Sequence, residues 1–414
     1  MDECSFTFFV GVDWGASHHQ VCILPAGSEK ARQHRVRHEP KALRTLFDLL
    51  RQLGPADSIA IAIESPASPV TEPLVEAGWA VFSINPKQLD RCRDRFSPAG
   101  AKDDRRDAHV LAHCLRSDAA CFRRLAPVAP WQLDLRSLTR QRAALQADLR
   151  VQANRLREEL LTSFPQLLGL VAGADEPWLW DLLRIAPTPA HAARLGLPRL
   201  AGLLRRHRIR RFTAEQLQSA LRSGCLPLPR ASFERHGLAI SCLVGVLAAL
   251  DRALGDTERA LARVLEQRIE SENQGGQPRD LNIILSLPGV GTHVAATLLA
   301  EAHEALQRRD YHALRAHAGV APVTRSSGKS CLHLMRRSCN RRLRDALYHW
   351  GRCSCQNDQR SRDRYDLLRA RGHSHGRALR GVADRLLQLL CSLLRNQTAF
   401  DPARSGPSPA PRAA

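Results

Sequence analysis

The sequence lacks the paired cysteines that mark zinc and redox sites. Its 12 cysteines are scattered, none of them forms a C-x-x-C pair, and the closest two, Cys353 and Cys355, are spaced too tightly for a zinc knuckle. The pattern argues against a zinc protein and favours reduced thiols in the cytoplasm.

Signals for export or membrane insertion are also missing. The N-terminus, MDECSFTFFVGVDWG, begins with acidic residues and has no basic segment ahead of an apolar one. We find no apolar run of the roughly 20 residues that a membrane span needs. A soluble, cytoplasmic protein without a membrane partner is therefore expected.

Acidic residues are few relative to basic ones. The 414 residues contain 41 Asp and Glu against 61 Lys and Arg, a formal net charge of +20. Such a balance favours a polyanionic partner, most simply nucleic acid. A genome whose base composition favours arginine codons is the alternative explanation. The length allows two or three domains, each with its own core.

The first part of the chain alternates strands and helices. Strands are predicted over 5–15, 20–27, 58–66 and 79–86, the first two as a hairpin, and helices over 41–54, 70–78 and 101–115. This order predicts an α/β domain over 1–125.

The rest of the chain is predicted to be helical. Residues 133–161 carry a heptad seam, which predicts either a coiled coil or a long bundle helix within one subunit; its positions are Leu135, Leu138, Arg142, Leu145, Leu149, Gln152 and Leu156. A second long helix or broken pair covers 238–270, and 271–280 forms a linker. We expect a helical, coiled-coil region over 126–275, an all-α domain over 276–396 and a disordered tail over 397–414.

Carboxylates follow two of the predicted strands and open a helix. Asp13 and Glu64 end strands, and Asp103, Asp104 and Asp107 lie at a helix start. Four acids at one sheet edge would raise one another's pKa unless cations neutralised them, and oxygen ligands suit Mg²⁺, two ions in phosphodiester chemistry. The spacing alone does not choose among the three aspartates. Alternatively, they only cap the helix and pair with its arginines.

Several segments together resemble the DEDD transposases of bacterial insertion sequences. They are FFVGVDWGASHHQVCIL, IAIESP, INPKQLDRCRDRFSPAGAKDDRRDAHVLA, LPGVGTHVAATLLAE and HAGVAPVTRSSGKSCLHLMRRSCNRRLRDALYHW. The resemblance implies an RNase H-like (RuvC-like) N-terminal domain over 1–125 and a helical transposase domain over 276–396. A family pattern like K-x-D-x-x-D-A falls on Lys102, Asp104, Asp107 and Ala108, so the Mg²⁺ ligands implied are Asp13, Glu64, Asp104 and Asp107, with Asp103 a bystander.

The C-terminal part holds a second set of candidates. The Pro-Gly-Val-Gly turn at Gly289 and Gly291 is typical of a helix-hairpin-helix, whose backbone N–H groups approach phosphate; a plain helical hairpin is the alternative. The resemblance makes Ser327 a catalytic nucleophile, although sequence alone predicts a flexible polar loop there. The expected nucleic-acid contacts are Lys102, Gly289, Gly291, Arg325, Gly328, Lys329, Arg336, Arg337, Arg341 and Arg342.

The resemblance implies a DNA recombinase located at the bacterial nucleoid. It would act on donor and target DNA, use a structured bridge RNA as a guide, and assemble as a homo-oligomer, a tetramer by analogy. The alternatives are a metal-dependent junction nuclease that uses water, and an inactive nucleic-acid-binding relic. The histidines in ASHHQ and GHSHGR lack a third ligand nearby, so a loop or RNA-contacting surface is expected.

Overall fold

The computed structural model describes residues 6–64, 68–96, 103–223, 228–274, 280–328 and 330–403. The chain divides into two compact units, residues 1–129 and 130–414, which are described separately. Lys102 and Lys329, both expected to contact nucleic acid, lie outside the described residues.

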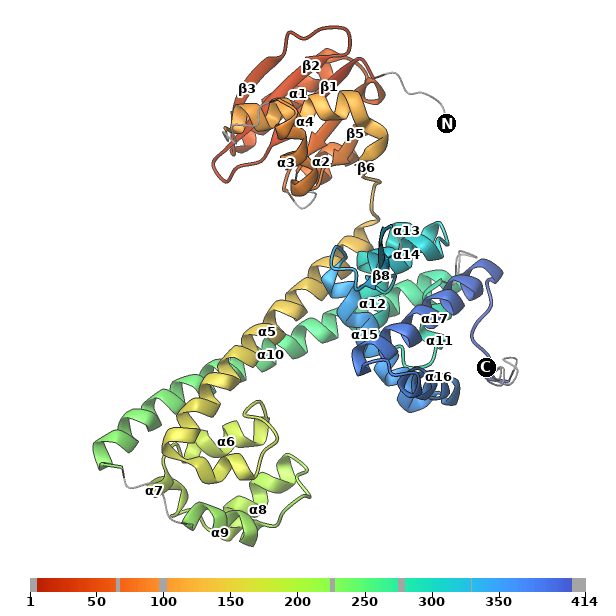
Figure 1. Ribbon diagram of the computed structural model, residues 1–414. Coiled ribbons are helices and arrows are strands. Elements are labelled where there is room, and N and C mark those ends of the chain that lie inside the picture. Colours follow the sequence, from red (N-terminus) through yellow and green to blue (C-terminus); the bar gives the residue numbers. More distant parts are fainter. Residues whose placement is uncertain are drawn as a thin grey trace. The chain divides into compact units, whose positions relative to one another are not determined.

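The first unit is built on a six-stranded mixed sheet (Figure 1). Its strands are β1 (Phe8–Asp13), β2 (His18–Pro25), β3 (Arg32–Arg37), β4 (Ile59–Ile63), β5 (Ala80–Ser83) and β6 (Arg123–Arg124), in the order β3-β2-β1-β4-β5-β6. β1 pairs antiparallel with β2 and parallel with β4, and β5 continues parallel to β4. The α/β prediction is confirmed, and the sheet is compatible with an RNase H-like domain.

The two-residue strand β6 was not predicted, and two longer elements, a strand and a helix, were missed as well. β3 has the sequence RQHRVR and buries only Val36, so it carries no apolar alternation. Helix α3 (Pro86–Asp94) buries only Leu89, and it is specified instead by a capping box that Asn85 and Gln88 form. Both elements border the candidate site.

Helices cover both faces of this sheet. α1 (Pro40–Leu53) and α2 (Thr71–Glu76) pack on the face formed by residues such as Val10, Ile61 and Val81. α4 (Asp104–Asp118) packs on the opposite face, where the side chains include Phe9, Ala60 and Ala62. Alternate residues of each strand therefore point into different cores.

Glycine and alanine bring α4 unusually close to the sheet. A Cβ atom built on Gly11 would lie 2.0 Å from the carbonyl oxygen of Ala108 and 2.7 Å from the backbone nitrogen of Ala112. Only a residue without a side chain fits there, because both neighbours are backbone atoms. The contact fixes the height of α4 over β1.

The second unit is organised around two long helices, α5 (Pro130–Ser163) and α10 (Arg230–Gln274). Leu135 near the start of α5 shares a core with Leu261 of α10, whereas Leu156 near the end of α5 shares another core with Ile240. The two helices therefore run antiparallel within one subunit, as Figure 1 shows. Arg142, a polar seam position, forms an ion pair of 2.8 Å with Glu258 of α10.

Shorter helices complete the two cores. One core adds α6 (Pro177–Ile185), α7 (Pro189–Ala192), α8 (Leu197–Arg206) and α9 (Ala214–Arg222). The other adds α11 (Asp280–Ser286), α12 (Thr292–Glu301), α13 (His303–Gln307), α14 (Tyr311–His317), α15 (Arg341–Asn357), α16 (Gln359–Ala370) and α17 (His375–Asn396).

Three expectations for this unit need correction. The region over 276–396 is not all-α, because β7 (Val323–Ser327) and β8 (Ser330–Leu334) form an antiparallel hairpin. Residues 397–403 are ordered, since Phe400 packs on the core and its N–H donates to the Ser286 hydroxyl; 404–414 lie outside the described residues. Contrary to expectation, α10 contains a stretch long and apolar enough, by composition alone, to cross a membrane, although it pairs along α5.

The close contact at Gly11 predicts a large effect of one methyl group. Gly11→Ala should destabilise the first unit by about 1–3 kcal/mol or more, because the new Cβ meets backbone that cannot move aside. Urea unfolding would measure the loss. Gly27→Ala is the matched control, since its Cβ would meet nothing within 4 Å. Equal stability of the two variants would contradict the packing account.

Candidate functional site

Asp13 and Glu64 lie side by side at the carboxyl end of the sheet. Val12 pairs with Ile63 in the parallel β1–β4 register, and the two acids are the next residue on each strand. Side chains of a strand alternate between its two faces. Asp13 is therefore on the same face as Phe9 and Gly11, and Glu64 on the same face as Ala60 and Ala62, which is the face that α4 covers.

The first turn of α4 reaches the same edge. Asp104 lies four residues before Ala108, the residue that contacts Gly11, so it continues the sheet-facing stripe of α4 past the end of the strands. Asp107 precedes Ala108 directly and is only 2% exposed. Asp13, Glu64 and the first turn of α4, which carries Asp104 and Asp107, thus lie toward the same end of the sheet.

Asp107 is engaged by an arginine that the sequence analysis did not single out. Arg93 of α3 donates two hydrogen bonds to it, Nε to Oδ1 at 2.6 Å and Nη2 to Oδ2 at 2.9 Å. The same guanidinium pairs with Asp90. Burial by itself lowers the pKa of Arg93. The hydrogen bonds and charge of Asp107, with the charges of Asp90 and Glu64, outweigh that effect, so the pKa of Arg93 is raised overall. Arg93 therefore acts as a fixed counter-charge among these acids.

Asp103 has a different environment from its neighbours. It is the N-cap residue of α4, and its side chain accepts a hydrogen bond from the Arg105 N–H at 3.5 Å. Capping satisfies one of the free amides at the helix start. The alternative of a helix cap thus applies to Asp103, whereas the neighbouring Asp107 pairs with Arg93 instead.

The four acids suit a divalent cation in kind, because all their donors are oxygen. Within the residues that the structure describes, however, no three His, Cys, Asp or Glu side chains gather closely enough to hold a metal ion. A metal ion at Asp107 would compete with the Arg93 guanidinium, whose positive charge already neutralises this carboxylate.

The histidines of ASHHQ do not lie in a loop. Both belong to the start of β2, and His19 is buried, stacked on Trp14 at 3.9 Å and bonded to His38 at 3.3 Å. Burial, with the charges of His38 and His18, lowers the pKa of His19 to about 4. A neutral, buried His19 holds the turn after Asp13 rather than contacting RNA.

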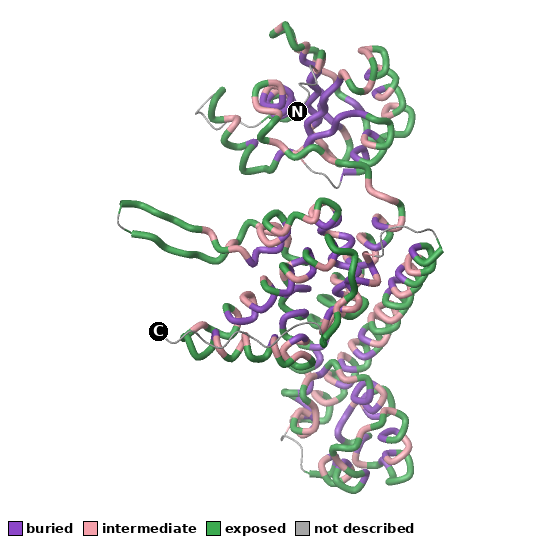
Figure 2. The backbone as a smooth tube through the Cα atoms, turned by 90° about the vertical axis from the view of Figure 1, so that its right-hand side faces the viewer, coloured by how far each residue is buried: buried purple, intermediate pink, exposed green. Residues whose placement is uncertain are grey.

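Ser327 lies at the end of the exposed β7–β8 hairpin. It pairs with Ser330 beside the turn, where Gly328 has a φ of +55°. Figure 2 shows both strands exposed and extending away from the helices of their unit. Alternation places Arg325, Leu332 and Leu334 on the face of Ser327.

Basic residues continue from this hairpin into α15. Five arginines of this surface form no ion pair with the residues that the structure describes. They are Arg325, Arg336, Arg337, Arg341 and Arg342. Arg341 and Arg342 are exposed in the first turn of α15. The guanidinium groups of the exposed Arg325, Arg337, Arg341 and Arg342 are therefore available to phosphate, whereas Arg336 is half-buried.

The two glycines of the α11–α12 turn have unequal surroundings. Gly289, with a φ of +75°, packs against α15, because an added Cβ would lie 2.6 Å from the Ser354 nitrogen. The Pro288 carbonyl accepts hydrogen bonds from Trp350 and Ser354, which anchors the turn. Gly291 has open space around it at the start of α12.

Comparison with known proteins identifies the family. A DEDD family model described as a transposase matches residues 10–165, and the model of the IS116/IS110/IS902 transposase family matches residues 281–366. The "Mini-circle putative transposase for IS117" of Streptomyces coelicolor is 31% identical over 98% of both chains. This chain belongs to the DEDD transposase family. The family consists of DNA transposases of insertion sequences and implies dependence on a divalent metal.

Other relatives support this membership of the DEDD transposase family. The "Putative transposase y4uE" of Sinorhizobium fredii is 44% identical over 50% of this chain and 58% of its own length. An uncharacterized 42 kDa protein of insertion element IS900 from Mycobacterium paratuberculosis is 27% identical over 95% of this chain and 97% of its own.

The buried ion pair makes Arg93 a strong determinant of local stability in this transposase. Arg93→Ala should destabilise the α3–α4 region by about 3–5 kcal/mol, because it leaves the Asp107 carboxylate buried without its partner. Hydrogen exchange of the α4 amides would report the loss. Arg91→Ala, on an exposed position of the same helix, is the control. Adding Asp107→Asn to Arg93→Ala should restore part of the protection of the α4 amides against hydrogen exchange. Exchange rates in Arg93→Ala equal to those of the wild type would refute the role of the ion pair.

Proposed function

We propose that this transposase cuts and rejoins DNA with a serine nucleophile and a carboxylate-bound metal site. The observation that carries the proposal is the meeting of Asp13, Glu64 and the first turn of α4 at one sheet edge. A RuvC-like, RNase H-type first domain over 1–125, a helical region over 126–275 and a serine-containing domain over 276–396 are the arrangement proposed.

The carboxylates would hold Mg²⁺, as two ions, through Asp13, Glu64, Asp104 and Asp107. Bound there, the ions would stabilise charge on the attacking and leaving oxygens of a phosphodiester. Arg93 would have a part in this cycle, because its guanidinium occupies one acceptor site on each Asp107 oxygen and its positive charge would repel a metal ion there. Arg93 already pairs with Asp90, so on release from Asp107 it would keep that pair and could also contact a phosphate.

Ser327 would supply the nucleophile. Its Oγ forms a bond to phosphorus and one phosphodiester P–O bond breaks, while the serine proton, taken up by a base, is passed on to the leaving deoxyribose oxygen, which departs as a hydroxyl. Resealing reverses these steps with another DNA end. The exposure of the hairpin supports the assignment, since the serine must reach a DNA backbone.

Nucleic-acid recognition would divide between the protein and a bridge RNA. The protein would hold phosphates through Lys102, Gly291, Gly328, Lys329 and the hairpin arginines, while base pairing selects donor and target DNA. Gly289 would act by positioning this turn.

Joining two duplexes calls for several subunits, and a tetramer is the proposed state. Exposed apolar side chains support self-association, among them Leu332 and Leu334 on the hairpin and Leu238 and Val246 on α10. A nucleoid location in the cytoplasm follows from the same proposal.

Replacing the nucleophile separates this mechanism from hydrolysis. Ser327→Ala should abolish any covalent protein–DNA adduct on denaturing gels, while leaving RNA binding intact. A water-using nuclease would give free cut ends without an adduct, and an inactive binder neither. Ser326→Ala, the adjacent residue on the opposite hairpin face, is the matched control. An adduct that persists in Ser327→Ala would overturn the assignment.

The aspartates at the start of α4 should differ in their effects. Asp104→Asn and Asp107→Asn should each abolish recombination by removing a carboxylate, whereas Asp103→Asn should retain most of it, because asparagine also caps a helix. EDTA should stop cleavage by the wild type. A loss of recombination in Asp103→Asn as large as in Asp104→Asn would mean that the carboxylate assignment is wrong by one residue.

A further inference from the structure

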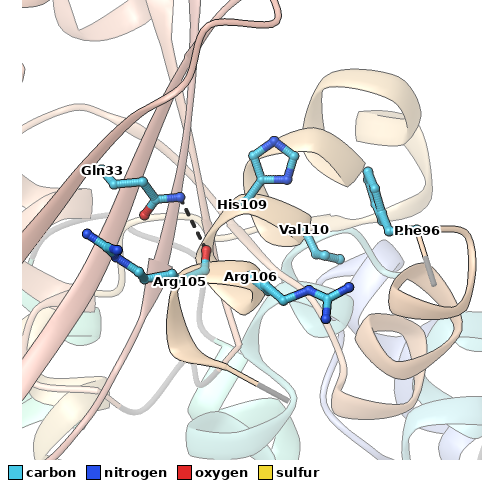
Figure 3. Close-up of a pocket in the computed structure, with 6 residues that line it drawn as sticks. All are labelled: Gln33, Phe96, Arg105, Arg106, His109 and Val110. Atoms are coloured by element: carbon cyan, nitrogen blue, oxygen red, sulfur yellow. Dashed lines mark hydrogen bonds between the residues drawn. The ribbon is translucent and has the colours of Figure 1, made fainter. Parts of the chain in front are cut away.

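A hollow of about 330 Å³ lies beside the first turns of α4, bordered by strand β3 and by the residue that follows α3. Figure 3 shows its lining: Gln33 of β3, Phe96 after α3, and Arg105, Arg106, His109 and Val110 of α4. Neither the proposed chemistry nor the hairpin uses these residues. The hollow is nevertheless near the acids, since Arg105 directly follows Asp104.

The charge of this hollow is positive and uncompensated. Arg105 and Arg106 are exposed, and within the described residues neither guanidinium forms an ion pair. Figure 3 shows the two side chains leaving the first turn of α4 in different directions, with His109 one turn later. Such an arrangement attracts an anion, and arginine suits phosphate.

An exposed aromatic ring stands beside these arginines. Phe96 is 41% exposed, although phenyl rings are usually buried. His109 and His113 contact it edge to face, with ring centroids 5.8 and 4.9 Å away. The histidines thus hold the phenyl ring in place while leaving part of it open to solvent, as a stacking platform requires.

The floor of the hollow is fixed by hydrogen bonds. The buried Gln20 side chain donates from Nε2 to the side-chain Oε1 of Gln33 at 3.1 Å, and Nε2 of Gln33 donates to the backbone oxygen of Arg105 at 3.2 Å. This chain ties the first turn of α4 to β2 and β3. A ligand held here would therefore have a fixed position relative to Asp104.

We propose that this hollow binds one unpaired nucleotide, whose base stacks on Phe96 and whose two flanking phosphates contact Arg105 and Arg106 separately. The volume is at the lower end of the about 300–1,000 Å³ typical of small ligand sites, which suits one nucleotide better than a duplex. The inference rests on the proposed function in one respect: the bound single strand belongs to the nucleic acid on which the transposase acts. The site would direct that strand toward the carboxylates.

Binding of labelled oligothymidine, oligouridine and a duplex to the full-length protein tests the proposal by fluorescence anisotropy. Phe96→Leu should weaken single-strand binding about 5- to 150-fold, the equivalent of one lost base stack, whereas Phe96→Tyr should retain it. Duplex binding should not change. Equal binding by Phe96→Leu and the wild type, or an equal loss for strand and duplex, would overturn the proposal.

The arginines have their own readout. Arg105→Gln and Arg106→Gln should each reduce the slope of log K against log salt by about 0.7 for single strands, as loss of one phosphate contact predicts. Arg91→Gln, an exposed arginine of α3 outside the hollow, should leave the slope unchanged. An equal slope change in all three variants would show a diffuse surface and contradict the site.

Photo-crosslinking locates the contact and identifies the strand. Oligonucleotides with 5-iodouracil, as DNA and as RNA, should crosslink to the peptide containing Phe96, and the arm that reacts identifies the source. Asp107→Asn should lose recombination yet keep this crosslink, so failure of the catalytic proposal and of this one are distinguishable. Crosslinks that never include this peptide would refute the nucleotide site.

Discussion

The contact between Gly11 and Ala108 is the constraint on which the candidate site depends. Because β1 has no side chain at that position, the backbone of α4 can lie directly on it. Asp13 follows Gly11 by two residues, and Asp107 precedes Ala108 by one, so the same contact brings both acids to one sheet edge. A single methyl group at Gly11 would push them apart. Local packing and chemistry are therefore specified by the same residues.

Charge then determines how such a site exists within a stable fold. Asp107 is buried, and a buried carboxylate needs a cation. Arg93 supplies one from α3, which explains how the domain tolerates the acid before any metal binds. The exchange of Arg93 for a metal ion would couple the α3–α4 region to activation. The hairpin with Ser327 contrasts with this buried pair, because its residues are almost all exposed and contribute little to any core.

The sequence predicted the elements whose apolar spacing is clear and missed those held by polar contacts. β1, β4, α1 and α5 carry regular apolar patterns, and each was predicted close to its observed bounds. β3 and β7 are largely polar, and β8 carries Leu332 and Leu334 on an exposed face, so strand pairing rather than burial in a core holds these elements. Asp13, Glu64, Asp104 and Asp107 stood out as carboxylates at element ends. Arg93 did not, because its partner is 14 residues away in sequence and no local pattern joins them.

The resemblance and the residues contributed different information about function. Strand ends indicated an acidic cluster, while only the family pattern separated Asp104 and Asp107 from Asp103. The structure distinguishes Asp103 from Asp107, since Asp103 caps α4 and Asp107 is buried in an ion pair, whereas Asp103 and Asp104 are both exposed. Ser327 rests on the resemblance, because no structural feature of the hairpin distinguishes its hydroxyl from that of Ser326 apart from the face on which each lies.

The central claim is that Asp13, Glu64, Asp104 and Asp107 share a divalent cation at the end of β1. Anomalous diffraction from crystals of the full-length protein grown with Mn²⁺ tests it most directly. The account predicts a manganese peak between Asp13, Glu64 and the first turn of α4, with Asp107 released from Arg93. Manganese bound elsewhere, with the Arg93–Asp107 pair intact, would contradict it.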